Sequence, residues 1–419
     1  MWRRHRSWLI GPFLGLWATG SAAQSDFSAR VKWFGTATAL PEHDLQRNLS
    51  GTPAYDQNYD LRLMFQKTIS AVTLQVEHST TLVTGDSLNF PTAPGTVLEQ
   101  SPEGDERRLM DLTWEIEDGD RHRSFHRLDR LALKLRRDDW AVTVGREAVS
   151  WGAGLVFRPM DLFNPFAPTA VDRDYKAGDD LLLIERLFSD GSDLQVLAVG
   201  RRDETGDFTG QAGSLAGKWR GFIGACEVEL MAAKHYRDQV YGIGVRYPLK
   251  GAMLRTDLVA TRLADGGARV GGVVNLDYSL EVAGRTTYVF AEYFHNGFGV
   301  SELPETVEEL PAPLLDRLGR GELFNVMRDY LAGGVTYQWH PLLVQTVTLI
   351  GNLNDGSLLL QTQINFDPGD NQRLELGVVE PLGGSGDEFG GVPVVADPAG
   401  SRLTVGGGSR LYARWVYYF

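Results

Sequence analysis

The sequence has only one cysteine, Cys226, among its 419 residues. One cysteine cannot form an intramolecular disulfide, and it excludes a metal site built from several thiolates. Repeated apolar runs of about 20 residues are also lacking, which excludes a bundle of membrane-spanning helices. Basic charge is scarce as well, because 54 Asp and Glu outnumber 41 Lys and Arg. The resulting net charge of -13 argues against a nucleic-acid partner.

The composition that is present favours a large β structure. Hydrophobic residues make up 43% of the chain and aromatic residues 10%, which excludes intrinsic disorder. The 48 glycines indicate many turns, without a collagen-like period. The length suits two or three soluble domains or one large β domain.

Residues 1–23 carry the features of a secretory signal peptide. Arg3, Arg4 and Arg6 precede an apolar stretch from Trp8 to Trp17, and small residues follow up to Ala23. Cleavage is expected after Ala23, so residues 24–419 would form the exported protein. An uncleaved anchoring helix is the alternative, but Gly11, Pro12 and Gly15 interrupt its apolar span.

Strict alternation of apolar and polar residues recurs along the exported part. The segments with the clearest alternation are 59–66, 72–77, 110–116, 130–136, 358–366 and 373–378. The same pattern would fit a soluble β-sandwich, with the apolar face turned inward. We find about nineteen strand-like segments, whereas a barrel with both ends in the periplasm needs an even number. Eighteen strands are therefore predicted, with sixteen as the alternative, and the conflict lies in 106–117 and 127–137.

Short and long connections alternate between these segments. Short turns are predicted at 137–139, 190–193, 248–251, 283–285 and 367–370, and long connections at 41–58, 83–105, 148–180, 298–325 and 381–407. This asymmetry is typical of outer-membrane barrels, which have short periplasmic turns and long extracellular loops.

The last nine residues form the most hydrophobic strand of the chain. One face of that strand is formed by Leu411, Ala413, Trp415, Tyr417 and Phe419. A terminal strand frays unless something holds it, and in a closed barrel it would pair with the first strand. This ending resembles the terminal strand of Gram-negative outer-membrane β-barrel proteins. The resemblance implies a transmembrane antiparallel β-barrel that closes through this strand.

The segment from Val142 to Gly154 ends a strand at Gly145-Arg146 and opens a long, proline-containing stretch. It resembles the region of general porins that leads into an inward-folded constriction loop. The candidate constriction residues of this region are Arg146, Arg158, Asp161, Asp172, Arg173, Asp174 and Lys176. A structural plug or an ordered outer cap remains the alternative for 148–180.

Three basic residues upstream share the face opposite a leucine face. Arg130, Lys134 and Arg136 alternate with Leu131, Leu133 and Leu135, so in a barrel they would point into the lumen. Charged rings in a lumen can set ion preference, although such charges often only neutralise one another.

Catalysis is the competing function, because some outer-membrane barrels are hydrolases. His122, Ser124 and His126 form a possible local cluster on one strand face. However, the chain has no G-x-S-x-G nucleophile turn, no H-E-x-x-H metal pair and no C-x-x-C-H haem motif. We therefore predict neither an enzyme nor a cofactor or metal site.

Together these features predict a porin-like channel in the cell outer membrane that passes small polar or charged solutes. Its expected partners are outer-membrane lipid, the barrel-assembly machinery and the solutes, with no nucleic acid. The first alternative is a plugged, non-conducting barrel that holds a periplasmic or surface protein partner, for polymer export or as an electron-transfer sheath. The second alternative is a barrel hydrolase.

Overall fold

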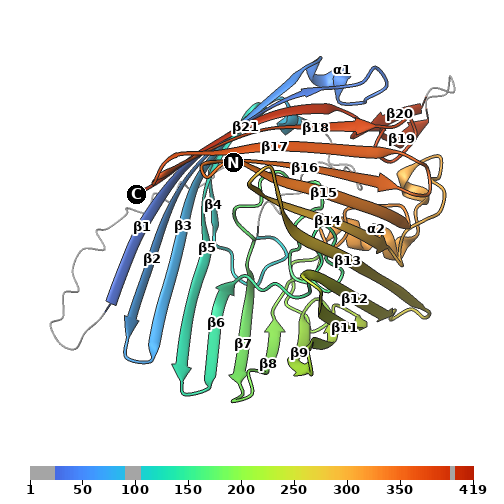
Figure 1. The fold of residues 1–419 in the computed structure, drawn as a ribbon. Helices are drawn as coiled ribbons and strands as arrows, with labels where there is room; N and C mark the ends of the chain where they lie inside the picture. The colour runs from blue at the N-terminus through green and yellow to red at the C-terminus, as the bar shows by residue number, and fades with distance from the viewer. Residues whose placement is uncertain (1–23, 90–104, 397–401) are drawn as a thin grey trace.

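The computed structural model describes residues 24–89, 105–396 and 402–419, in which β-strands dominate (Figure 1). The predicted signal peptide, residues 1–23, lies outside the described residues. The strands are β1 (Gln24–Ala39), β2 (Ala54–Ile69), β3 (Val72–Gly85), β4 (Thr113–Gly119), β5 (His122–Arg137), β6 (Trp140–Glu147), β7 (Asp179–Leu187), β8 (Asp193–Val199), β9 (Ser214–Ile223), β10 (Cys226–His235), β11 (Asp238–Leu249), β12 (Ala252–Arg262), β13 (Ala268–Val282), β14 (Arg285–His295), β15 (Asp329–His340), β16 (Leu343–Asn352), β17 (Leu358–Gly369), β18 (Gln372–Leu382), β19 (Val392–Ala396), β20 (Arg402–Val405) and β21 (Ser409–Tyr418).

The helical segments are short. They are the helices α1 (Arg47–Ser50) and α2 (Ala312–Gly319) and the 3-10 turns Ser87–Asn89 and Val307–Glu309. Within the described ranges, no helix is both long enough and apolar enough to cross a membrane.

Antiparallel pairing closes the main sheet into a barrel. β21 pairs with β18 on one side and with β1 on the other, where Trp415 lies opposite Trp33. Closure pairs the backbone groups that a first and last strand would otherwise leave free, which is required of any strand structure in a bilayer. β19 and β20 form a separate two-stranded sheet in the connection 383–408.

The sheet contains nineteen strands, but the barrel has eighteen, because β4 and β6 share one edge of β5. β4 pairs with the His122–Arg127 part of β5, whereas β6 pairs with the Leu131–Arg137 part. β3 occupies the other edge of β5. The prediction of an eighteen-strand barrel is therefore confirmed. The surplus segment was the one predicted within 106–117, which is a strand only over Thr113–Gly119.

The two ends of the barrel differ in their connections. At the end that holds the start of β1 and the end of β21, here called the turn end, the strands are joined by short turns such as 70–71, 138–139 and 283–284. The opposite end, here called the loop end, carries the long connections 40–53, 148–178, 200–213, 296–328 and 383–408. Of the predicted long connections, 41–58 was too long because β2 already begins at Ala54.

Alternation places apolar side chains on the outside of the wall. On β13, for example, Val274, Leu276 and Tyr278 are exposed, whereas Asn275 between them is buried. Exposed aromatic residues gather near both ends of this outer face: Trp140, Tyr247, Trp339, Phe366 and Phe419 at the turn end, and Tyr55, Tyr59, Tyr241 and Tyr293 at the loop end. Two such girdles are typical of barrels that cross a membrane.

A buried ion cluster completes the wall at the loop ends of the short strands β6, β7 and β8. The guanidinium of Arg146 donates hydrogen bonds to Asp105 at 2.9 Å, to Asp180 at 2.9 and 3.1 Å, and to the carbonyl oxygen of Met110. Arg108 also donates to Asp105 and forms a backbone bridge to Arg201, beyond the end of β8. The cluster therefore holds residues 105–112 across the loop ends of these strands.

We expect Arg146→Met to destabilise the folded barrel by about 3–5 kcal/mol, because it removes the counter-charge of the buried Asp180 and leaves the buried Asp105 with Arg108 alone. Unfolding in urea would measure this loss, and proteolysis within 105–112 should begin at lower urea. The matched control is Arg137→Met, because the side chain of Arg137 is 86% exposed at the end of β5. Equal stabilities of the two variants would contradict the assigned role of Arg146.

Candidate functional site

The segment between β6 and β7, residues 148–178, lies inside the barrel and is called the lumen loop (Figure 1). It hydrogen-bonds inward-facing side chains on strands all around the wall. These side chains are Arg30, Lys32, Glu77, Arg130, Gln195, Glu229, Asp257, Asn275, Glu292, Gln361 and Arg414. The loop is thus attached to the wall on several sides of the lumen.

Three inward-facing carboxylates hold the first part of the lumen loop by its backbone. Glu292 on β14 accepts hydrogen bonds from the amides of residues 155, 156 and 157 at 2.7–2.9 Å. Asp257 on β12 accepts from the amide of Ala153, and Glu229 on β10 from that of Gly152. Asn275 donates both to Glu292 and to the carbonyl oxygen of Ala153. These acids take the place of water for a backbone segment that forms no regular structure.

Ion pairs hold the last part of the lumen loop on the opposite side. Asp172 pairs with Lys32 and Arg414, and Asp174 pairs with Arg30 and Arg414. The cations belong to β1 and β21, the two strands that close the barrel. The loop therefore also links the first and last strands through their side chains.

Tyr175 forms a further anchor. The guanidinium carbon of Arg62 lies 3.5 Å from the centre of its ring and that of Arg130 4.5 Å from it. The hydroxyl of Tyr175 donates to Glu77 on β3. Cation–π contacts of this kind are strongest where water is excluded.

Lys176 and Asp161 form an internal pair within the loop. The ammonium of Lys176 donates to both carboxylate oxygens of Asp161 at 2.7 Å and to Val149 and Ser150. Burial raises the pKa of Asp161 and lowers the pKa of Lys176. This pair fixes the fold of the loop and leaves neither charge free for a solute.

Arg158 and Arg173 are the two cations of the lumen loop that lack a carboxylate partner. Arg173 donates only to the carbonyl oxygens of residues 167, 168 and 170, and Arg158 donates to that of Gly154. Among the described residues, no acid lies within 4.0 Å of either guanidinium. Burial and the nearby charge of Arg158 lower the pKa of Arg173 to about 10, so Arg173 remains cationic at neutral pH.

The remaining predicted lumen residues have different surroundings. Arg130 and Lys134 both pair with Glu147, at 3.1 and 2.6 Å. Arg136 is exposed near the turn end of β5, and Arg146 lies in the wall cluster described above. Arg158 and Arg173 are therefore the predicted candidates on the loop whose positive charge is not neutralised.

Apolar packing fills part of the barrel toward the loop end. Phe157 of the lumen loop stacks on Phe294 with ring centres 4.5 Å apart, within a core cluster that includes Leu314 and Leu318 of α2. A second cluster surrounds Trp151 and Met160 against β7 to β12. The aromatic residues of the lumen loop are thus packed against the wall and against α2.

The three residues of the possible hydrolase cluster are on the outer face of the wall. His126 contacts Thr80 at 2.9 Å and the ring of His78, while His122 pairs with Glu117 at 3.0 Å. No hydrogen bond between Ser124 and either histidine occurs in the described structure. A bulge after Leu128 then reverses the alternation, which turns Arg130 inward.

At the loop ends of β9 and β10, a serine, a histidine and a glutamate form a continuous chain of hydrogen bonds. Ser214 lies 2.9 Å from Nδ1 of His235, and Nε2 of His235 lies 3.0 Å from Glu322. All three are nearly buried, and Arg201 also donates to the Ser214 hydroxyl. This chain of contacts attaches the connection 296–328 to β9 and β10. Groups of three or more potential metal ligands are absent from the described ranges.

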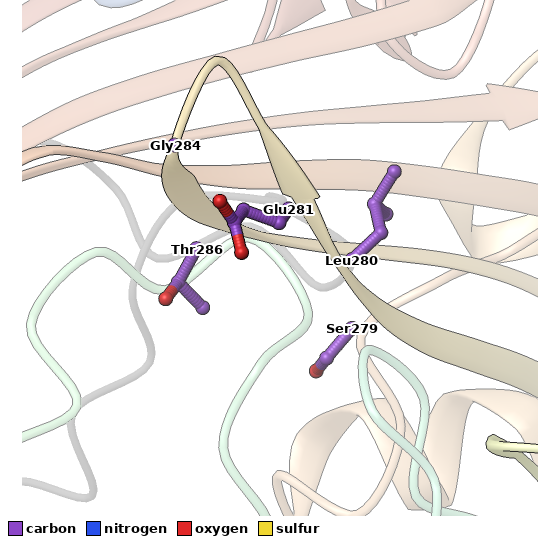
Figure 2. Close-up of a pocket in the computed structure, with 5 residues that line it drawn as sticks. All are labelled: Ser279, Leu280, Glu281, Gly284 and Thr286. Carbon is purple, nitrogen blue, oxygen red and sulfur yellow. The ribbon is translucent and has the colours of Figure 1, made fainter.

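A cavity of about 370 Å³ lies at the turn between β13 and β14 (Figure 2). Ser279 and Thr286 point to the same side of this hairpin, and Leu280 points away from it. Glu281 is its single charged lining residue. All lining residues belong to one hairpin, so the cavity is separate from the lumen loop.

Several contacts between the lumen loop and the wall were not predicted from the sequence. Asp257 and Glu292 are the single acids on the inward faces of β12 and β14, and such isolated acids were the available signal. The basic partners Arg30, Lys32 and Arg62 also alternate with apolar residues in 29–34 and 59–65. Their pairing with 172–175 depends on contacts across more than a hundred residues.

Comparisons with known proteins support the fold. OpdK of Pseudomonas aeruginosa, solved with vanillate, has 13% identity and a TM-score of 0.51, with 95% of this chain and 98% of that chain covered. OccK2 (OpdF) of the same organism, in complex with glucuronate, has 11% identity and a TM-score of 0.51 over 94% and 98%. OccAB3 of Acinetobacter baumannii has 10% identity and a TM-score of 0.51 over 94% and 99%. No family model and no curated protein matches the sequence.

We expect Glu292→Ala to release the first part of the lumen loop, because three buried amides lose a charged acceptor. The predicted loss of stability is about 3–5 kcal/mol. Proteolysis of 148–160 in the folded barrel would detect the release. Glu292→Gln should retain part of the anchoring through its amide oxygen, and the exposed Glu281→Ala serves as control. An unchanged cleavage pattern in Glu292→Ala would refute this role.

Glu388 is a fully buried acid in the connection 383–408. Its carboxyl accepts from the amide of Val326, the hydroxyl of Tyr330 and the side chain of Asn352. Burial raises the pKa of Glu388 to about 7 from 4.5. A raised pKa stabilises the fold below pH 4.5, and this stabilisation is lost as pH rises through 7, by about 3 kcal/mol.

Hydrogen exchange of amides 383–391 should therefore accelerate between pH 5 and 8 beyond the intrinsic pH effect. Glu388→Gln should remove this additional dependence. A variant with the same pH dependence as the unmodified chain would show that Glu388 is not the titrating group.

Proposed function

We propose that this protein is a channel in the outer membrane of a Gram-negative bacterium and that small polar or charged solutes diffuse through it. The observation that carries the proposal is a closed eighteen-strand barrel whose interior holds a loop with two cations lacking carboxylate partners. Barrels of 16–18 strands are wide enough to leave an aqueous path. The outward apolar band and its two aromatic girdles support insertion in a membrane.

The preferred solute in this proposal is a small organic anion, with a carboxylate as the recognised group. Arg158 and Arg173 are the candidate binding residues, because a carboxylate bound to them would not have to displace an internal acid. Guanidinium groups bind carboxylates through paired, charge-assisted hydrogen bonds. Vanillate and glucuronate, named with two of the structurally similar proteins, are both carboxylates.

The proposed mechanism is passive. A solute would enter the lumen, exchange water for one or both guanidiniums, and leave on the other side because the contact is weak enough to break. The anchored lumen loop would hold both cations in place during passage. Neither step requires a catalytic group.

Export, domain organisation and membrane partners are also part of the proposal. Residues 1–23 would direct export and be removed, and 24–419 would form one barrel domain. The barrel-assembly machinery and outer-membrane lipid would be its partners during insertion. The strand residues Leu411, Ala413, Trp415, Tyr417 and Phe419 would face that lipid beside the closure.

The second candidate is a plugged barrel that serves as a scaffold for another protein. The apolar clusters around Phe157 and Trp151 favour it, because they occupy part of the interior near the loop end. Conductance separates the two candidates, since a plugged barrel folds normally but carries no current.

We expect the purified exported chain to give discrete current steps in a planar bilayer, with a reversal potential that indicates anion preference. Arg158→Gln with Arg173→Gln should lower the anion-to-cation permeability ratio several-fold and leave the barrel folded. Arg137→Gln with Arg237→Gln removes the same charge from exposed connections and should leave the ratio unchanged. A folded barrel without any current would refute the channel and favour the scaffold.

A further inference from the structure

A cavity of about 440 Å³ lies at the loop end of the barrel, beside the ends of β13 and β14. Strand residues and two parts of the connection 296–328 enclose it. Its lining residues are Ala268, Arg269, Val270, His295, Gly297, Phe298, Gly299, Val300, Pro311, Pro313, Leu314 and Arg328. The cavity is thus built by two neighbouring strands and by the loop that follows them.

Both arginines of this cavity lack a carboxylate partner. Arg269 donates to the carbonyl oxygen of Ala268 at 3.0 Å, and Arg328 donates to that of Gly299 at 3.4 Å. In the part of the chain that the structure describes, no acid lies within 4.0 Å of either guanidinium. Asp329, which follows Arg328, is already hydrogen-bonded to His295 and Tyr293. The cavity therefore presents two cations with unused donors.

The rest of the lining is mainly apolar. Its apolar side chains are those of Val270, Phe298, Val300 and Leu314, together with Ala268 and two prolines. A free inorganic anion would gain nothing from such walls, whereas an amphiphile would bury apolar surface there. The lining thus suits a ligand that carries both an anionic group and a hydrocarbon part.

The height of the cavity along the wall fits a lipid head group. Val270 and Leu280 both face outward on β13, and ten residues of a strand tilted by about 40° rise about 26 Å. The apolar band of such barrels is about 25 Å tall. Val270 therefore lies near the loop-end boundary of the band, four residues beyond Val274, which pairs with Tyr293 of the aromatic girdle. Head groups of the outer leaflet lie at this level.

We propose that this cavity binds the phosphate-bearing head group of a glycolipid in the outer leaflet. Arg269 and Arg328 would bind the phosphate by charge-assisted hydrogen bonds, and Val270 and Phe298 would contact the start of an acyl chain. The proposal rests on the outer-membrane location proposed above but not on channel activity. Its two arginines are distinct from Arg158 and Arg173, the candidate residues of the solute path.

Native mass spectrometry of the folded barrel in detergent would test this site with three probes. The probes are bis-phosphorylated lipid A, the same lipid without its phosphates, and inorganic phosphate. We expect binding of the phosphorylated lipid only. Arg269→Gln with Arg328→Gln should weaken that binding about tenfold or more. The matched control is Arg237→Gln with Arg262→Gln, which removes two charges from the neighbouring part of the same rim.

Three outcomes would overturn the proposal. The first is equal binding of the dephosphorylated lipid, and the second is equal affinity in the test and control variants. The third is displacement of the lipid by an equal concentration of inorganic phosphate, which would indicate a site for free anions. Heat-modified gel mobility verifies that each variant is folded, and Arg269→Lys with Arg328→Lys should retain much of the binding. Bilayer conductance of the double Gln variant should stay unchanged, which separates this test from that of the channel.

Discussion

A loop that lies inside a barrel loses much of the water that would otherwise hydrogen-bond its backbone. The wall must then supply hydrogen-bond partners for that backbone. In this protein the partners are inward-facing carboxylates on strands of the wall. Glu292 alone accepts three successive amide groups, and Asp257 and Glu229 accept two more. Since these acids face inward from different strands, the path of the lumen loop depends on the register of the barrel.

The charges inside the barrel are divided between two sides. Acids on β10, β12 and β14 hold the amide-rich first part of the lumen loop, whereas cations on β1 and β21 hold its acidic last part. Most inward charges are thereby neutralised, as Arg130 and Lys134 are by Glu147. Electrostatic preference in the lumen then depends on the few groups left over. The proposed anion preference therefore rests on Arg158 and Arg173, which lack a carboxylate partner, and not on the total count of basic residues.

The loop end is organised as a second packed layer. The connection 296–328 places α2 against the lumen loop, and Glu388 ties the connection 383–408 to Tyr330 and Asn352. Ser214, His235 and Glu322 join the same layer to β9 and β10. These contacts leave the turn end with little more than short hairpins. The asymmetry between the ends is thus one of packing as well as of loop length.

Local patterns in the sequence were sufficient for the fold. Alternation, turn residues and the aromatic terminal strand are properties of neighbouring residues, so they predicted a closed antiparallel barrel and its eighteen strands. The parity conflict was visible, but only tertiary pairing placed β4 and β6 on one edge of β5. Local patterns also predicted a long connection at 148–180, with a constriction, a plug or an outer cap as its possible roles. Which charges neutralise one another, such as Arg146 with Asp105 and Asp172 with Lys32, was decided by the tertiary structure alone, because ion pairing depends on distance in space and these partners are far apart in the chain.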